Sequence, residues 1–545
     1  MSMHHPSGLL QAVLFLASCF GFAQSPSPQP QVYQSNTTVK STTRLVVVDV
    51  VATDSGGRPV TGLGVDDFTV LENGAQQKIS NFSFQNGSGV QPVTRAPLPP
   101  NVVTNAPSFQ SGVLDVILFD SVNGDFKNQA YARDQLIRFF SKTTLNRPVA
   151  LFALESQLKL LHDFTTDTGA LKSAIEKYKQ VAMAQTTESL ESRSTPFTTQ
   201  GDYHTGERNI ETTLNQLNAL SKILSGYPGR KNLIWLSESF PLDLYPDTVM
   251  SSGVNISDIS AGPGGSPQRS DPNAFSTMVS GAAMKNFSSL VKKVADSMMN
   301  AQVAIYPVDA AGVSKDEHLA ALHTANDMAE RTGGRAFHNR NDLEQSIQAS
   351  ITDGDTYYTL SYYPENKKWD GQFRAIQIKS ARPGLTLRHR VGYYAIDPEE
   401  ALKEDANRVS EDFSRALLFD SPAVTAVRFQ AGVVPPSPDT KGKLLVNFAV
   451  DPHTLHFNRG EDGVQHGRIT CVVWAYGKNK DKPVMSQGAT SSADLKPEVF
   501  EDAMKKLFPC TQELALKPGT YTLRLGVLDR NSNLMGTATT PVAVR

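Results

Sequence analysis

The pattern of hydrophobic and polar residues changes twice along the chain. Residues 44–86 contain short β-branched runs separated by turn residues such as Glu72–Gly74, which predicts a small β-sandwich module. From residue 113 onward, wholly apolar runs alternate with segments that repeat apolar residues at helical spacing. Residues 415–545 return to strand-like runs, which predicts a C-terminal β-sandwich-like domain.

The middle segment has the composition of a buried parallel sheet with helices between its strands. Its four apolar runs are residues 113–119, 148–154, 232–236 and 303–308. Its helical segments are residues 126–142, 171–178, 210–224, 287–299, 319–331 and 343–351. The predicted fold class is therefore multidomain α/β plus β. A central doubly wound, Rossmann-like parallel sheet is flanked by small N-terminal and C-terminal β-sandwich modules.

Three more strand-like runs follow this segment. They are residues 357–363, 373–380 and 385–394. We expect them to extend the central sheet in antiparallel fashion, so that the central domain spans residues 113–395. The first run is rich in tyrosine, from Tyr357 to Tyr363. Core packing of these rings is the favoured interpretation, and an aromatic surface for a partner is the alternative.

The first 43 residues predict export rather than a folded domain. Residues 8–23 are apolar and uncharged, and small residues precede Gln24, which predicts a signal peptide over residues 1–23. Alternatively, Leu16–Cys19 resembles a bacterial lipobox, in which Cys19 is lipidated and anchors the chain. Residues 24–43 are rich in Pro, Ser, Gln and Thr and predict a flexible linker. We therefore expect a periplasmic or secreted protein, or a lipid-anchored protein of the cell envelope.

The net charge, the apolar runs and the cysteine content limit which classes of function the chain can have. A net charge of -2 over 545 residues gives no bulk attraction to nucleic acid. No apolar run beyond the N-terminus is long enough to span a membrane once the signal is removed. Besides Cys19, only Cys471 and Cys510 occur, and in an exported chain they either form a disulfide or remain two buried thiols.

Several motifs resemble the von Willebrand factor type A domain, in particular a related family common in Acidobacteria. The motifs are Asp67–Gly74, Leu114–Asp120, Arg230–Ser239, Thr332–Phe337 and Arg388–Ala395. The resemblance covers roughly residues 40–395, and it implies an A-type fold for the central sheet. It also implies a protein-binding or adhesion role, although a fold alone does not establish a function.

The resemblance further implies a Mg²⁺ or Mn²⁺ site, which in this family uses an Asp-x-Ser-x-Ser loop, a distant Thr and a second Asp. Here Asp120 is present, but Val122 and Gly124 replace the two serines, and Glu238 stands where Asp is usual. The site is therefore degenerate. Its candidate metal ligands are Asp120, Glu238 and Thr205.

Two questions about this metal site stay open in the sequence. Thr212 and Thr213 are alternatives to Thr205 as the threonine ligand. The alternative to a cation is that Asp120 caps a helix or accepts hydrogen bonds from its own loop, so that no cofactor is bound.

The sequence contains no nucleophile elbow, zinc-protease motif, P-loop or dinucleotide-binding motif. The leading hypothesis is an exported, non-enzymatic protein-binding or adhesion protein with an unknown protein partner. Its contacts would come from loops near residues 120–125, 205–209 and 238–243. One alternative is a structural component of the cell envelope that makes contacts through its β modules. Another is an exported hydrolase whose triad forms only in the folded chain.

Overall fold

The computed structural model describes ten ranges of the chain and a few single residues between them. The ranges are 45–86, 97–107, 112–124, 126–178, 200–238, 290–310, 319–338, 342–396, 406–460 and 462–545. The side chains of residues 200–207 and 319–324 lie outside the described part. The predicted signal peptide, the linker and Cys19 lie outside it as well.

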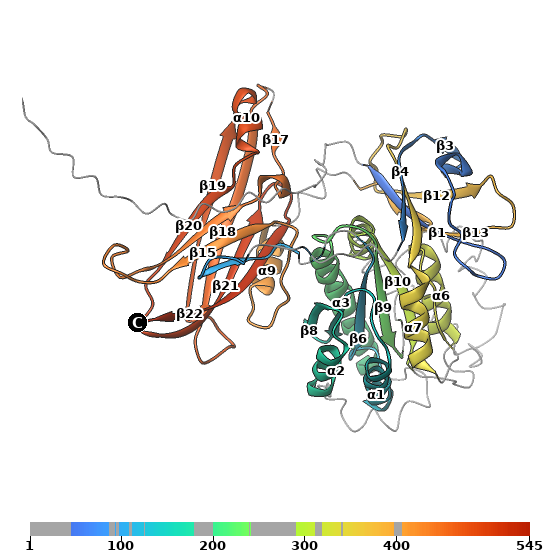
Figure 1. The fold of residues 1–545 in the computed structure, drawn as a ribbon, viewed down its shortest axis with the longest axis horizontal. Helices are drawn as coiled ribbons and strands as arrows, with labels where there is room; N and C mark the ends of the chain where they lie inside the picture. The colour runs from blue at the N-terminus through green and yellow to red at the C-terminus, as the bar shows by residue number, and fades with distance from the viewer. Residues whose placement is uncertain are drawn as a thin grey trace, which may run out of the picture.

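A mostly parallel five-stranded sheet forms the centre of the molecule, with the strand order β10-β9-β6-β7-β8 (Figure 1). Its strands are β6 (Leu114–Asp120), β7 (Val149–Leu154), β8 (Leu158–Thr165), β9 (Lys231–Ser237) and β10 (Val303–Asp309). Only the edge strand β8 runs antiparallel to its neighbour in this sheet. The predicted α/β plus β fold class is confirmed, because antiparallel sheets flank this central sheet.

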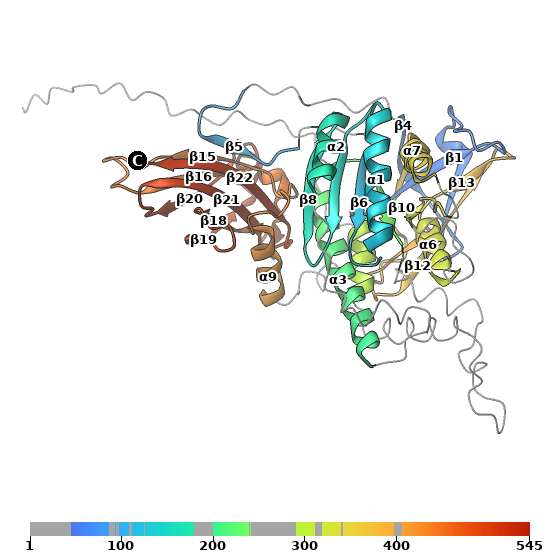
Figure 2. The ribbon, with the colours of Figure 1, turned by 90° about the horizontal axis from the view of Figure 1, so that it is seen from below.

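Helices cover both faces of the central sheet (Figure 2). Alternate residues of β6 face opposite sides, so Val116 and Leu118 belong to one core cluster and Ile117 and Phe119 to the other. The first cluster includes residues of α3 (Gln200–Leu224), helix 290–300 and α6 (Leu319–Thr332). The second includes residues of α1 (Phe126–Lys142), α2 (Thr168–Lys177) and α7 (Leu343–Asp353).

The strands near the N-terminus pair with strands that follow the central sheet. One antiparallel sheet has the order β13-β1-β11-β4 and the other the order β14-β12-β2-β3. The early strands are β1 (Val46–Thr53), β2 (Phe68–Glu72), β3 (Ala75–Gln77) and β4 (Ile79–Asn86). The late strands are β11 (Thr356–Tyr362), β12 (Phe373–Ser380), β13 (Thr386–Arg388) and β14 (Gly392–Tyr394). We call these eight strands the composite unit. The sequence analysis predicted that the late strands extend the central sheet, and this prediction is wrong. Strands β11, β12 and β13 pair with β1, β2 and β4 instead, because these early strands supply their partners in the composite unit.

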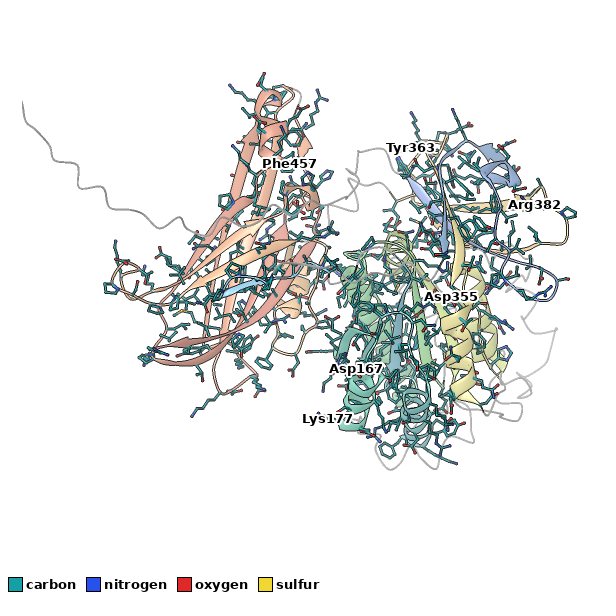
Figure 3. All side chains as sticks on the ribbon, viewed as in Figure 1. Asp167, Lys177, Asp355, Tyr363, Arg382 and Phe457 are labelled. Carbon is teal, nitrogen blue, oxygen red and sulfur yellow. The ribbon has the colours of Figure 1, made fainter. Side chains whose placement is uncertain are left out.

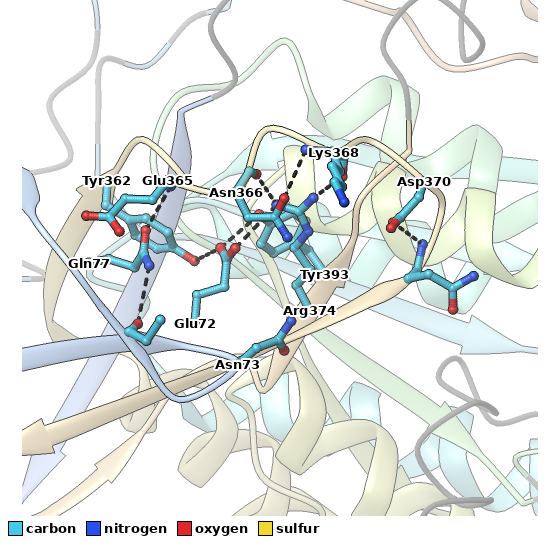
Figure 4. A network of polar contacts seen from close by, with 12 residues as sticks. Glu72, Asn73, Gln77, Tyr362, Glu365, Asn366, Lys368, Asp370, Arg374 and Tyr393 are labelled. Carbon is cyan, nitrogen blue, oxygen red and sulfur yellow. Dashed lines mark hydrogen bonds and ion pairs between the residues drawn. The ribbon is translucent and has the colours of Figure 1, made fainter.

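A buried polar network holds the composite unit together (Figure 4). Glu72 is 4% exposed, and its carboxylate accepts hydrogen bonds from the hydroxyls of Tyr362 (2.8 Å) and Tyr393 (2.9 Å). Arg374 donates to Glu72 (3.3 Å) and to the backbone carbonyls of Asn366 and Lys368. The burial of Tyr357, Tyr358 and Tyr362, each at most 1% exposed, agrees with the core-packing interpretation of the tyrosine-rich strand, and only Tyr363 is exposed.

A second polar network connects the composite unit to the amino-terminal edge of the central sheet. Arg147 forms an ion pair with the fully buried Asp115 (Nε–Oδ2 2.6 Å), and the side-chain amide of Asn232 donates to the same carboxylate (3.0 Å). Nearby, Arg388 of β13 donates two hydrogen bonds of 2.7 Å to Asp353 at the end of α7. Buried charges of this kind are tolerated because each has a partner.

The C-terminal unit is a β-sandwich of two antiparallel sheets. One has the order β20-β16-β15-β5, and the other has the order β17-β18-β21-β22 with β19 also paired to β18. Its strands are β15 (Phe429–Val434), β16 (Leu444–Val450), β17 (Asn458–Arg459), β18 (Gln465–Tyr476), β19 (Met485–Leu495), β20 (Phe508–Leu514), β21 (Gly519–Asp529) and β22 (Met535–Val544). The remaining strand, β5 (Val102–Thr104), comes from the segment between the composite unit and the central sheet and pairs with β15.

The C-terminal unit packs against the central unit through α9 (Ala406–Ala416). Val409 and Phe413 of α9 belong to the same core cluster as residues of α3, and Asp412 forms a 2.7 Å ion pair with Lys222. Directly after α3, Gly226 lies so close to Thr425 that a β-carbon would be 2.1 Å from its hydroxyl oxygen. In the described ranges, none of the helices is both long and apolar enough to cross a membrane.

Candidate functional site

The carboxyl ends of the parallel strands meet at the edge of the central sheet that lies opposite the composite unit. In Figure 3, Asp355 marks the edge near the composite unit, and Lys177, the last residue of α2, lies toward the other end. Asp120 is the last residue of β6 and is only 4% exposed. Because it continues the row of Val116 and Leu118, its side chain points to the face of the sheet covered by α3.

Five hydrogen bonds converge on the Asp120 carboxylate. Oδ1 accepts the backbone N–H groups of Val122 (2.9 Å) and Asn123 (3.0 Å). Oδ2 accepts the side-chain amide of Asn123, the indole N–H of Trp235 and the hydroxyl of Ser237, each at 2.9 Å. Both carboxylate oxygens are thus saturated by protein donors from the β6–α1 loop and from β9.

Burial raises the pKa of Asp120 above its ordinary value, and the hydrogen bonds from Asn123, Val122 and Ser237 oppose that rise. These donors favour the charged carboxylate, because each of them needs a lone pair on it. The negative charge is therefore balanced by fixed protein dipoles.

The same loop is also tied to the neighbouring helices. The side chain of Asn123 donates to the hydroxyl of Thr213 in α3 (3.0 Å), and both residues are buried. The hydroxyl of Ser121 lies 2.9 Å from that of Tyr178, which donates to Glu155 (2.7 Å). The loop at residues 121–124 is consequently fixed from three sides.

Of the candidate metal ligands, Asp120 and Glu238 lie at this edge. Glu238 follows β9 and lies against Gly124, where an added β-carbon would be 3.1 Å from the Glu238 Oε2 atom. Thr205 belongs to α3, but its side chain lies outside the described part. Thr213, which the sequence left as an alternative, is the threonine that contacts the Asp120 loop.

These side chains do not fit a divalent cation bound directly to Asp120. Mg²⁺ and Mn²⁺ need oxygen ligands with free lone pairs, and the indole of Trp235 offers only a donor. A cation at Oδ2 would have to displace three donors at 2.9 Å. Across the described ranges, no three Asp, Glu, His or Cys side chains are grouped so that they could share a metal ion.

Trp235, Ser237 and Phe126 were not singled out from the sequence. The alternation of side chains along β9 could have identified Trp235 and Ser237. Leu118 pairs with Trp235, and Ser237 is the next residue on the same face of the sheet. Phe126 begins α1 beside the Asp120 loop and is 59% exposed, more than any other large apolar side chain in the described part. The sequence alone does not distinguish Phe126 from an apolar residue on the buried face of this helix.

The two cysteines lie in the core of the C-terminal sandwich, on facing sheets. Cys471 of β18 is fully buried and Cys510 of β20 is 6% exposed, and both are present as free thiols that hydrogen-bond to each other. The hydrogen bond from Cys471 lowers the pKa of Cys510 to about 7, whereas the same contact and burial raise the pKa of Cys471.

No protein-family model and no curated protein matches the chain. Among solved structures, the chain is similar to the von Willebrand factor domain of the type V pili tip protein Mfa5 from Porphyromonas gingivalis. The identity is 14%, the match covers 46% of this chain and 97% of that one, and the TM-score is 0.21. The chain is also similar to the PilB minor pilin from Streptococcus sanguinis, with 13% identity and a TM-score of 0.23. This match covers 45% of this chain and 60% of the pilin chain. A third similar structure is the ArnB paralog VWA2 from Sulfolobus acidocaldarius, with 10% identity and a TM-score of 0.21. This match covers 92% of this chain and 76% of that chain.

Proposed function

We propose that this chain is an exported, non-enzymatic protein that binds a protein partner at the carboxyl edge of its central sheet. The observation that carries the proposal is the exposed ring of Phe126 beside a loop that is already held rigid around Asp120. Exposed aromatic side chains on ordered supports are the usual anchors of protein interfaces. The resemblance to the von Willebrand factor type A domain agrees with this role.

In this proposal, the partner is bound without a bridging metal ion. In the usual adhesion site, a carboxylate of the partner completes the coordination of the cation. Here the place of the cation is taken by the donors of Asn123, Trp235 and Ser237. Because the loop is already fixed before binding, it loses less conformational entropy when the interface forms. No metal ion is therefore needed to order the loop.

Two carboxylates at the same edge of the sheet indicate the chemistry of the partner. Glu155 and Glu238 follow β7 and β9 at the same edge, and both are partly exposed. An apolar pocket rimmed by Lys or Arg on the partner would suit an aromatic anchor next to carboxylates.

A photo-crosslinking amino acid at Lys127, the exposed neighbour of Phe126, tests the proposal in intact cells. We expect one crosslinked partner that is lost in a Phe126→Glu variant and persists in EDTA. The matched control carries the crosslinker at Val499 in α10 (Pro497–Ala503), which is 50% exposed. Crosslinking only from Val499 would favour the structural envelope role. Loss of the Lys127 crosslink in EDTA would contradict binding without a metal.

A further inference from the structure

A cleft of about 320 Å³ lies between the central unit and the C-terminal unit. Leu160 of β8 lines it from the central sheet, and β21, β22 and the segment 419–423 line it from the sandwich. Both ribbon views place β8 on the side of the central sheet that faces the C-terminal unit (Figures 1 and 2). Cavities of this size between domains are typical sites for small ligands.

Arg524 of β21 lines this cleft and is only 2% exposed. Its guanidinium donates to the hydroxyl of Thr539 (2.6 Å) and to the backbone carbonyl of Ala416, but Nε has no hydrogen-bond partner. Among the described residues, no carboxylate lies within ion-pair distance of it. Of the comparably buried arginines, Arg147 and Arg374 each have such a carboxylate, Asp115 and Glu72. Arg230 has none in the described part, but its Nε atom donates to Asn232 and its guanidinium donates to Tyr306 and to the carbonyl of Gly333.

Lack of a countercharge is costly for a buried cation. Burial lowers the pKa of Arg524 to about 10, and the more distant Tyr476 and Asp420 only partly oppose this effect. A carboxylate brought into the cleft would supply the missing charge, and carboxylates bind the planar guanidinium well.

The rest of the lining leaves little other polar chemistry for a ligand. The hydroxyl of Thr537 already accepts the N–H of Val424, and the side chain of Asn105 is bound to the carbonyls of Val424 and Val427. The other cleft residues include apolar side chains: Val103, Leu160, Phe419, Ala423 and Ala538.

We propose that this cleft binds a small monocarboxylate with a short apolar tail, whose carboxylate pairs with the guanidinium of Arg524. The apolar tail lies against Leu160 and Phe419. Asp420, an exposed residue of the cleft, opposes the anion through its own negative charge. Because Leu160 belongs to the central unit and Arg524 to the C-terminal unit, the ligand bridges the two units.

Calorimetric titration of the full chain with butyrate and with its neutral analogue butyramide tests this inference. We expect saturable binding of butyrate that is at least about tenfold tighter than that of butyramide, since a charge-assisted pair contributes at least 1.4 kcal/mol. Equal affinities for the two compounds, or no heat from either, would overturn the proposal.

Three variants locate the binding site within the fold. Arg524→Lys should weaken butyrate binding at least about tenfold, and Asp420→Asn should strengthen it several-fold. Leu160→Trp fills the cleft from the other unit and should abolish binding while leaving Arg524 in place. If Arg524→Lys fails to fold, the other two variants still decide the matter. Unchanged affinity in both would place butyrate elsewhere and refute the assignment.

Discussion

The indole N–H of Trp235 donates a 2.9 Å hydrogen bond to Oδ2 of Asp120, across two neighbouring strands of the central sheet. A tryptophan can only donate at this position, so its presence commits the Asp120 carboxylate to accepting hydrogen bonds from the protein. Because of this hydrogen bond, the carboxyl edge of this sheet differs from a metal-dependent adhesion site. It also leads to a direct stability prediction.

Trp235→Phe removes the indole donor while keeping most of the buried ring. We expect the free energy of unfolding to fall by about 2–3 kcal/mol, because a hydrogen bond to a charged group is lost inside the core. Urea unfolding followed by circular dichroism measures this change. The matched control is Trp474→Phe, since Trp474 is only partly buried and the described structure gives its indole no hydrogen bond. Equal losses in the two variants would contradict the importance of the Asp120 contact.

Glu72→Gln removes the charge at the centre of the composite-unit network. We expect a loss of about 3 kcal/mol in unfolding free energy, because Arg374 would remain buried without a countercharge. Asp67→Asn, directly before β2, is the control, since the side chain of its partner Arg382 is 49% exposed and a much smaller effect should result. Similar midpoints of urea unfolding for the two variants would refute this ranking.

Gly226→Ala tests how tightly the C-terminal unit packs on the central unit. Its new methyl group would fall 2.1 Å from the Thr425 hydroxyl oxygen and 2.4 Å from the Thr425 carbonyl carbon, so one of the two units must shift. We expect a loss of about 1–3 kcal/mol and faster proteolysis of the chain between the units. Gly432→Ala in β15 is the control, because no atom lies within 4 Å of its added β-carbon. Unchanged proteolysis in Gly226→Ala would contradict the close packing.

We propose that Cys471 and Cys510 form a disulfide when a small-molecule disulfide such as oxidised glutathione reacts with them. The Cys510 thiolate attacks one glutathione sulfur and releases reduced glutathione. Cys471 then loses its proton, attacks Cys510 in the mixed disulfide and releases a second reduced glutathione. The reaction should accelerate as pH rises through about 7, where the Cys510 thiolate forms. Mass spectrometry measures it, and a pH-independent rate or a stable mixed disulfide would contradict the proposal.

The same lowered pKa has a consequence for stability. A thiol in the unfolded chain has a pKa of about 8.5, above the native value of about 7 for Cys510. The native thiolate therefore contributes stability that is fully present above about pH 8.5 and is lost as the pH falls through 7. Comparison of reduced wild type and Cys510→Ser in urea at pH 6 and pH 9 measures this contribution. A difference between the two proteins that does not grow with pH would contradict it.

Local patterns in the sequence were sufficient for the central unit. The helix predicted over residues 126–142 coincides with α1, and the four predicted apolar strands match β6, β7, β9 and β10 to within one residue at each end. In these elements, apolar residues at a regular period face a buried surface, so the sequence itself carries the signal. The polar edge strand β8 lacks such a run and was not predicted.

The composite unit could not be predicted in the same way. Asp49 of β1 accepts a hydrogen bond from Thr359 of β11, although 310 residues separate them. Strand patterns predict which residues form strands, but not which distant strand supplies the partner. The strand β5 was likewise not predicted, because its partner β15 lies in the C-terminal unit.

The site was predicted only in part, for a related reason. Asp120 and Glu238 were identified from their positions in motifs that resemble a known family. The roles of Trp235 and Thr213 depend on the register between β6 and β9 and on how α3 packs over them. That geometry decides whether Asp120 meets a cation or protein donors.

Calorimetric titration of the full chain with Mn²⁺, beside an Asp120→Ala variant, tests most directly the claim that protein donors replace a cation at Asp120. We expect heats indistinguishable from dilution for both proteins up to millimolar Mn²⁺. Saturable binding to the wild type that is lost in Asp120→Ala would contradict it, because the carboxylate would then be free to coordinate a metal ion.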